Sequence, residues 1–440
     1  MRVRPTARPL AALVAAVLGG SLAAAAPADA ASKPKSPVTP IISAAPADFF
    51  GMHVNGLQGK APVPSNKVVG SVRLWDTGTT WADLQPTGPT SWNWKPLDDA
   101  INHARRARLK PLVVFGQAPQ WAGTNASQVA PGYGPGSASM PKSLVAWRAY
   151  VTAVVAHASR LGVTDFQTWN EPNNGTFFNG SPKQMAALNL AAYQAVHATT
   201  VKRGKAVRKY PSAKLVGPGF TTRLSPQITW MQNYLKATGG NKLDVVALHL
   251  YGLPGRTPES AIDQLTKARR YLKVAKIDTL PLYVTEVSFG AAVGGVGPAE
   301  TISPALQAAY VARFLLLARS NGVARVYWYA WNNQSHKVSI DLTKADGKSL
   351  TDAGKAYQTT RTWLSQPLVG CVRASTGTWT CTVKQKRGSG YVVWNPSKKV
   401  RIAAPAATVS VTSVVGKKTA LKAGKALTVT TSPQYIATSK

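Results

Sequence analysis

The sequence predicts a (β/α)₈ barrel, the TIM-barrel fold of the α/β class, followed by a small all-β, sandwich-like C-terminal domain. Eight short apolar runs alternate with segments of helical periodicity over about 330 residues, which is typical of such a barrel. Near Gln366 the pattern changes to short, Thr- and Val-rich segments punctuated by Gly and Pro, with no helical stretch between them. A hydrophobic content of 45% supports a packed core and excludes a disordered polymer-binding chain.

The expected elements of the barrel follow one another along the chain. The eight expected strands span residues 49–54, 68–75, 111–115, 165–169, 214–216, 244–250, 281–285 and 323–330. Helices are expected at 97–109, 144–161, 260–274 and 305–321, where Pro or Ser precedes each start. Strands of the C-terminal domain are expected around 391–394, 400–402, 408–415 and 427–430. The predicted chain is therefore one large βα domain with a smaller β domain behind it.

The N-terminus has the pattern of an export signal. Three arginines precede an apolar stretch at 10–26, and Ala28-Asp29-Ala30 is a small-x-small cleavage site. No second apolar stretch of membrane-spanning length follows, which favours export over a membrane anchor. We therefore expect a signal peptide at 1–30, a leader at 31–44, the barrel at 45–365 and the β domain at 366–440. The expected location is extracellular, either free or associated with the cell wall.

The chain has two cysteines, Cys371 and Cys381, at the start of the β domain. In an exported protein two such thiols are expected to form a disulfide across the first hairpin. Ten positions apart and without a His or Cys companion, they do not have the pattern of a zinc site. The sequence predicts no metal and no cofactor.

The net charge of +35 suggests an anionic partner or surface. Twelve Lys or Arg lie between Arg373 and Lys440, where there is no acidic residue. An anionic cell wall or an acidic polysaccharide is the partner expected for this tail, with solubility as the plainer explanation. Nucleic acid is disfavoured for an exported chain without a nucleic-acid motif. A monomer is expected, and a non-catalytic wall-binding protein on a barrel scaffold is the alternative function.

Only four glutamates occur in the chain, so the position of each is informative. Glu259 and Glu300 lie near expected helix starts, where a carboxylate favours the helix dipole. Glu171 and Glu286 instead follow the fourth and seventh expected strands, on the barrel face where active sites form. Two carboxylates across a barrel mouth suit glycoside hydrolysis, in which one protonates the leaving oxygen while the other attacks or activates water. A pair of barrel-rim salt bridges is the structural alternative.

Trp169-Asn170-Glu171-Pro172 and the strand-ending Glu286 resemble the signature of the clan of retaining glycoside hydrolases that includes families 5 and 39. The resemblance covers the barrel and, more weakly, the tail through Ser432-Pro433-Gln434-Tyr435. It implies a carbohydrate substrate, an oligo- or polysaccharide, with Glu171 as acid/base and Glu286 as nucleophile. It also implies supporting roles for the residues that match the motif: Asn170 on the sugar 2-hydroxyl, Arg73 and Tyr251 on the nucleophile, and His249 in the His-x-Tyr motif.

Other substrate-binding candidates are less specific. The resemblance implies an aromatic floor for the sugar on the eighth strand, where both Trp328 and Trp331 could align. His53 and Asp76 end the first two strands and could bind sugar hydroxyls, or could be a packed histidine and a turn cap. Trp121 lies with Trp75, Tyr133, Phe177 and Phe178 in or beside βα loops, where aromatic faces stack on sugars or simply pack. We expect the pKa of Glu171 to lie above that of Glu286, as an acid and a nucleophile require.

Overall fold

A computed structural model describes residues 43–59, 61–198, 200–203, 206–209, 212–292, 299–332 and 338–439. The expected signal peptide at 1–30 and most of the leader lie outside these residues. Within the described part no helix is both long enough and apolar enough to cross a membrane.

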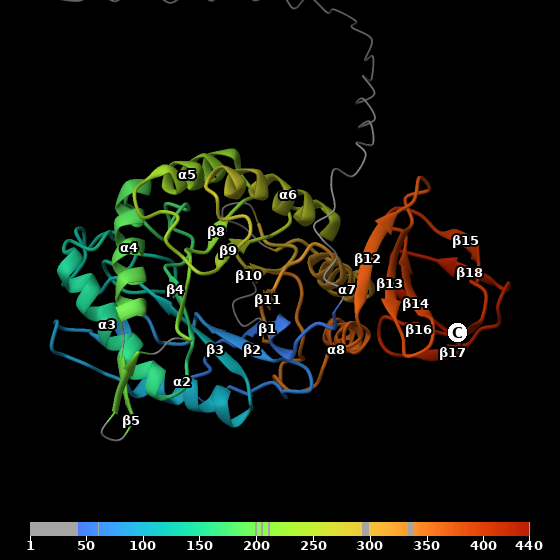
Figure 1. The fold of residues 1–440 in the computed structure, drawn as a ribbon, viewed down its shortest axis with the longest axis horizontal. Coiled ribbons are helices and arrows are strands. Elements are labelled where there is room, and N and C mark those ends of the chain that lie inside the picture. The colour runs from blue at the N-terminus through green and yellow to red at the C-terminus, as the bar shows by residue number, and fades with distance from the viewer. Residues whose placement is uncertain are drawn as a thin grey trace, which may run out of the picture. The chain divides into compact units, whose positions relative to one another are not determined.

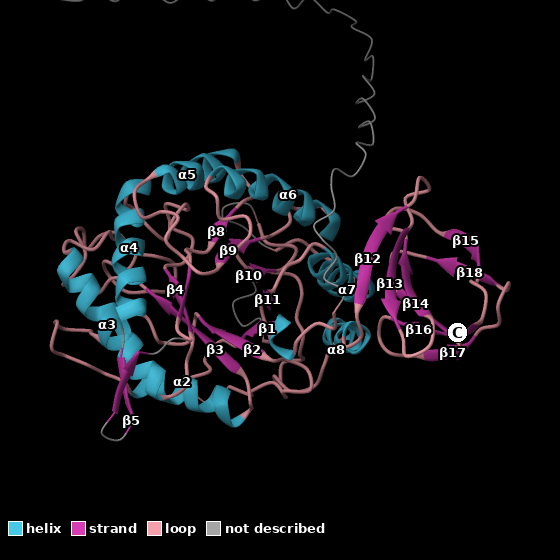
Figure 2. Cartoon of the chain, in the orientation of Figure 1, coloured by secondary structure: helices cyan, strands magenta, loops and turns pink. Residues whose placement is uncertain are grey.

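A curled, all-parallel sheet forms the centre of the larger domain (Figures 1 and 2). Its strands, in sheet order, are β7 (Lys214–Val216), β4 (Asp165–Thr168), β3 (Lys110–Phe115), β2 (Ser71–Leu74), β1 (Phe50–His53), β11 (Arg325–Trp328), β10 (Leu282–Val287), β9 (Val246–His249) and β8 (Phe220–Thr221). β7 and β8 are successive pieces of the fifth barrel position, and a bridge from Val216 to Val245 links them to β9. The predicted barrel class is confirmed, with its fifth strand interrupted.

Helices follow seven of the eight strand positions and surround the sheet (Figure 2). They are α1 (Trp81–Leu84), α2 (Lys95–Arg106), α3 (Leu144–Arg160), α4 (Pro182–Ala198), α5 (Ser225–Lys236), α6 (Pro258–Val274), α7 (Pro304–Ser320) and α8 (Asp352–Leu364). The 3₁₀ turn Ala47–Phe49 precedes β1, and a hairpin of β5 (Thr200–Arg203) and β6 (Ala206–Lys209) follows α4. The described residues between β1 and β2 form turns, so the expectation of a helix or helical crossover after every strand is wrong there.

Side chains alternate between the inside of the barrel and the helix layer because the strand period is two. In β2, Val72 and Leu74 join the outer core, whereas Arg73 points inward to Glu286. In β11, Val326 and Trp328 join the outer core, whereas Arg325 and Tyr327 face the interior. The barrel floor is polar as well as apolar, since Arg325 binds Asp165 at 2.7 Å inside it. This alternation sets which residues of each strand can reach the site.

The C-terminal domain is an antiparallel β structure, as predicted. Its six-stranded sheet runs in the order β12 (Leu368–Arg373), β13 (Trp379–Lys384), β14 (Ser389–Trp394), β19 (Gln434–Thr438), β16 (Thr408–Ser413) and β17 (Lys418–Ala420). A second pair, β15 (Val400–Ala403) with β18 (Ala426–Val429), packs its apolar side chains on this sheet. Two layers around a shared apolar cluster give the sandwich-like form that the alternating pattern predicts.

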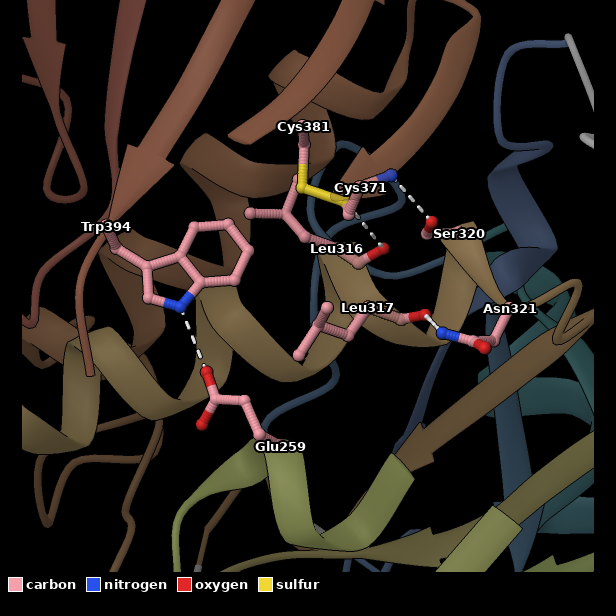
Figure 3. Close-up of a disulfide and its surroundings, with 8 residues drawn as sticks. All are labelled: Glu259, Leu316, Leu317, Ser320, Asn321, Cys371, Cys381 and Trp394. Atoms are coloured by element: carbon pink, nitrogen blue, oxygen red, sulfur yellow. Dashed lines mark hydrogen bonds between the residues drawn. A yellow bond between two sulfur atoms is a disulfide. The ribbon is translucent and has the colours of Figure 1, made fainter. Parts of the chain in front are cut away.

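The β domain is joined to the barrel through α6 and α7 (Figure 3). The indole of Trp394 in β14 donates a 2.9 Å hydrogen bond to Glu259 in α6. Glu259 also accepts bonds from Arg313 in α7, so one carboxylate ties two barrel helices to the tail. A disulfide joins Cys371 and Cys381, which lie opposite each other in β12 and β13.

Candidate active site

The two glutamates singled out by the sequence meet at the carboxyl ends of their strands. Glu286 lies within β10, and Glu171 follows β4 by three residues. Trp169 and Glu171 have φ values of +59° and +43°, in the left-handed region that such side chains rarely adopt. These two turns on either side of Asn170 bend the chain over the barrel mouth and direct the Glu171 carboxyl inward. Backbone strain of this kind is concentrated at functional sites.

Glu286 is held in position by a buried cation and a phenol. Arg73 donates to its Oε1 at 2.6 Å, and Tyr251 donates to its Oε2 at 2.8 Å. The other nitrogens of Arg73 bond Gln167 at 2.7 Å and Asn170 at 2.8 Å, so the guanidinium is fixed on three sides. Burial and the Glu286 charge raise the pKa of Tyr251, which keeps the phenol a donor. Each of these partners donates a hydrogen bond to the Glu286 carboxyl, and together they fix its position at the cavity.

Glu171 is paired with His249 on the other side of the site. His249 Nδ1 lies 2.9 Å from Oε1 of Glu171 and 3.4 Å from Oε2 of Glu286, and Asn174 donates to Glu171 at 3.1 Å. One ligand atom from each of Glu171, His249 and Glu286 falls within 4.8 Å of the other two. The carboxylates therefore face each other across a gap that one anomeric carbon could bridge.

The pKa of Glu171 lies in the opposite direction from the one expected. Burial alone would raise it, but the hydrogen bond and charge of His249 outweigh burial, and the pKa of Glu171 is lowered from its ordinary value. The sequence alone does not show the imidazole that the fold brings against the carboxyl. The His249 ring thus favours the ionised form of Glu171.

A cavity opens directly above the two carboxylates. Its described lining residues come from the loops after several strands and include Trp75, Asp76, Tyr133, Asn170, Glu171, Asn174, Phe177, Thr221, Arg223, Gln227, Tyr251, Glu286 and Tyr329. Asp76 accepts hydrogen bonds from Tyr133 at 2.5 Å and from Tyr329 at 2.9 Å, which brings two aromatic rings to one wall. Aromatic faces and convergent polar groups are what a sugar-binding cleft requires.

Comparisons with known proteins agree with this geometry. A family model described as "Glycosyl hydrolase catalytic core" matches residues 142–357. A β-xylosidase of Geobacillus stearothermophilus is 24% identical over 247 residues, which are 51% of this chain and 45% of that protein. The chain thus spans less than half the length of this curated relative.

Solved structures share the fold at low sequence identity. A family 39 glycoside hydrolase of Bacteroides cellulosilyticus has a TM-score of 0.66 at 18% identity, covering 90% of this chain and 81% of that one. A family 39 β-xylosidase of Caulobacter crescentus has a TM-score of 0.63 at 14% identity, covering 90% and 97%. Residues 142–357 therefore match a glycosyl hydrolase catalytic core, and the chain shares its fold with family 39 glycoside hydrolases.

Two tryptophans expected at the sugar site of this glycosyl hydrolase core lie elsewhere. Trp328 is fully buried between the barrel and α7, where it packs on Phe289 and Phe314. Trp331 is buried and donates to the carbonyl of Gly347. The two-residue period of β11 turns Trp328 outward and brings Tyr329 to the cavity in its place. The predicted sugar contact of either Trp is therefore corrected to Tyr329.

Two further candidates support the site from outside the cavity lining. His53 is fully buried, lies against Tyr329 and bonds the carbonyl of Thr285 at 3.0 Å. Trp121 packs edge-on against Trp81 and donates to the carbonyl of Gln85 at 2.7 Å. Neither lines the cavity: His53 is buried and does not reach a sugar hydroxyl there, and Trp121, expected to stack on a sugar or to pack, packs. His53 instead packs against Tyr329, which lines the cavity.

Several site residues were missed by the sequence reasoning. Gln167 bonds Arg73, Asn174 bonds Glu171, and Arg223 lines the cavity. Gly219 is also required, because a Cβ there would lie 2.4 Å from Nε2 of His249. Strand parity could have identified Gln167 and Tyr329, which occupy inward positions of β4 and just beyond β11. Arg223 and Asn174 belong to loops, whose course the local pattern does not predict.

Glu171, His249 and Glu286 also have the donor set of a metal site. Arg73 already places a positive charge 2.6 Å from Glu286, and a metal ion in the same gap would be repelled by it.

Proposed function

We propose that this chain hydrolyses O-glycosidic bonds of oligo- or polysaccharides by double displacement, with retention of the anomeric configuration. The observation that carries the proposal is the pair of carboxylates whose facing oxygens lie within 4.8 Å beside an open cavity. Retaining enzymes hold their carboxyl groups about 5–5.5 Å apart, whereas inverting enzymes need about 6.5–9.5 Å to admit a water. The short gap supports attack by a carboxylate rather than by water.

In the first step, a carboxylate oxygen of Glu286 bonds to the anomeric carbon. The bond to the leaving oxygen breaks with its electron pair on that oxygen, and Glu171 delivers a proton to it. His249 Nδ1 lies 2.9 Å from Oε1 of Glu171 and holds this carboxyl in position. In the second step, water attacks the anomeric carbon, Glu171 takes a proton from it, and Glu286 leaves as a carboxylate.

Arg73 and Tyr251 serve both steps by stabilising the charge that Glu286 carries before attack and after release. Asn170 is held by Arg73 at the barrel mouth, where its amide can donate to the sugar 2-hydroxyl. Preorganised donors of this kind cost no rearrangement when the charge develops.

Chemical rescue tests the nucleophile. In Glu286→Gly, added azide should enter the vacated space and attack the anomeric carbon, giving a glycosyl azide of inverted configuration, while the wild-type product is retained. The anomeric form is read by ¹H NMR within the first minutes of reaction. A rescued product of unchanged configuration would contradict the assignment of Glu286.

The substrate survey should begin with xylosides, because the curated relative is named a β-xylosidase. Aryl β-xylosides, aryl β-glucosides, and neutral and acidic polysaccharides together separate exo from endo action. Glu171→Gln is the matched control that shows whether any turnover comes from this site.

We further propose that the protein acts outside the cell as a monomer and adsorbs to anionic wall polymer or acidic polysaccharide through the β domain. The support is the export-type N-terminus and the acid-free tail, all of whose described Lys and Arg are exposed. Cell fractionation, light scattering and salt-dependent wall binding of the full chain test these points. Salt-sensitive wall binding with no turnover on any substrate would favour the non-catalytic alternative.

A further inference from the structure

The cavity contains a second arginine whose charge the mechanism does not use. Arg223 follows β8 and lines the cavity together with Glu171 and Tyr251. It differs from Arg73, whose three guanidinium nitrogens bond Gln167, Glu286 and Asn170 in a fully buried setting. The two hydrogen bonds found for Arg223 go to neutral groups, the carbonyls of Ala291 at 3.3 Å and Ala292 at 3.2 Å. Among the described residues it has no carboxylate within ion-pair distance.

The carboxylates that line the cavity each have a hydrogen-bonding partner. Glu286 is paired with Arg73 and Glu171 with His249, while Asp76 accepts from the hydroxyls of Tyr133 and Tyr329. Arg223 is thus the cation of the described lining without an anionic partner. Its guanidinium lies 5.7 Å from the ring centre of Tyr251, which holds the planar group at the cavity wall. The two hydrogen bonds to carbonyl oxygens orient the guanidinium of Arg223 but place no negative charge beside it.

Arg223 is placed on the side of the general acid. It lines the same cavity as Asn174, which bonds Glu171, and its charge lowers the pKa of Glu171. In double displacement the general acid lies beside the leaving group, because it protonates the departing oxygen. A group that meets Arg223 therefore belongs to the sugar on the leaving side of the scissile bond.

We propose that Arg223 is a specificity-determining residue that binds an anionic substituent, a carboxylate or a sulfate ester, on the leaving-group sugar. This inference rests on the proposed hydrolase function and names its preferred substrate class, an acidic oligo- or polysaccharide. An arginine fork matches carboxylate and sulfate oxygens geometrically, and a charge-assisted bond in a partly enclosed cleft is stronger than a neutral one. The net charge of +35 would also concentrate an acidic polymer around the enzyme.

The test compares matched leaving groups on the glycone that the wild type cleaves best. A 4-carboxyphenyl glycoside is measured against its methyl ester, which has the same shape near the bond but no charge, and a 4-sulfophenyl glycoside separates sulfate from carboxylate. The wild type should prefer the anionic compounds in kcat/KM. Arg223→Gln should lower the ratio of kcat/KM for the anionic compound to kcat/KM for the methyl ester about 10- to 100-fold, mainly through KM for the anionic compound.

Controls separate this role from a structural one. Arg223→Lys keeps the charge and should retain part of the preference, and Arg256→Gln removes an exposed charge outside the described lining and should retain all of it. An equal loss on charged and neutral compounds would mean that Arg223 only holds the loop at Ala291, and would overturn the proposal. So would a wild type that does not prefer anions while cleaving the ester. Absence of turnover on every compound would instead count against the hydrolase function itself.

Discussion

Two buried arginine–glutamate pairs occupy different parts of this molecule. Arg73 and Glu286 meet inside the barrel mouth, and Arg313 and Glu259 meet where α6 and α7 contact the β domain. In both, the arginine side chain is fully buried and both carboxylate oxygens accept hydrogen bonds. The difference is what lies beside the carboxylate. Glu286 borders a cavity and a second carboxylate, whereas Glu259 is covered by the indole of Trp394.

The comparison shows that ion pairing and burial do not by themselves mark a catalytic carboxylate. Burial raises the pKa of Glu259, but Arg313 brings this pKa below its ordinary value, so Glu259 is an ionised buried acid. Among the described residues, Glu259 neither lines the cavity above Glu286 nor shares that cavity with a second carboxylate. A catalytic carboxylate needs those two additional features, and they can be tested by removing each glutamate in turn.

The largest effect is expected from Glu286→Gln. Loss of the nucleophile should lower kcat roughly 10⁴-fold or more, because residues of one covalent mechanism act as a unit. The change also leaves the buried guanidinium of Arg73 without its counter-charge, so the thermal unfolding midpoint should fall as well, which differential scanning calorimetry can check. If Glu259→Gln reduced kcat to the same degree at a temperature where it is folded, the distinction between the two pairs would fail.

Glu259→Gln should mainly affect stability. It leaves the buried guanidinium of Arg313 without its counter-charge, and breaking a buried pair on one side typically costs about 3–5 kcal/mol. Urea unfolding followed by tryptophan fluorescence should show this loss, while kcat at low denaturant stays near the wild-type value. Unchanged stability would mean that the pair contributes nothing to the junction.

The loss of stability at acidic pH should depend on the Glu171–His249 pair. Folding lowers the pKa of the Glu171 carboxyl below its ordinary value of 4.5. The stability that the ionised carboxyl contributes is therefore present above about pH 4.5 and is lost as the pH falls through the lowered pKa. The urea midpoint of the wild type should therefore fall more steeply between about pH 6 and pH 3 than that of Glu171→Gln. Parallel curves would indicate that His249 does not stabilise the ionised carboxyl.

The smallest effect is expected from Trp394→Phe. This change keeps an aromatic ring next to Trp379 but removes the N–H that Glu259 accepts, while Arg313 still pairs with the carboxylate. A loss of about 1 kcal/mol in unfolding free energy is expected for one such hydrogen bond. If Trp394→Phe lowered the unfolding free energy as much as Glu259→Gln, the indole rather than the ion pair would hold the junction together.

The sequence predicted the barrel because strand and helix periods alternate regularly, and it located Glu171 and Glu286 because strand ends meet on one face. It did not predict the split fifth strand, where Gly217, Pro218 and Gly219 separate β7 from β8. It placed Trp328 at the site because the motif was aligned by residue type rather than by strand parity. The lowered pKa of Glu171 and the position of Arg223 depend on residues distant in sequence that only the folded chain brings together.

The bond between Trp394 and Glu259 has a practical consequence for engineering. The β domain cannot be freely exchanged for that of another enzyme. It binds Glu259, a carboxylate of the barrel that also joins α6 to α7. A chimera that replaces residues 366–440 should carry an indole or another donor at position 394. Otherwise the graft would lose the hydrogen bond that joins the β domain to Glu259 in α6.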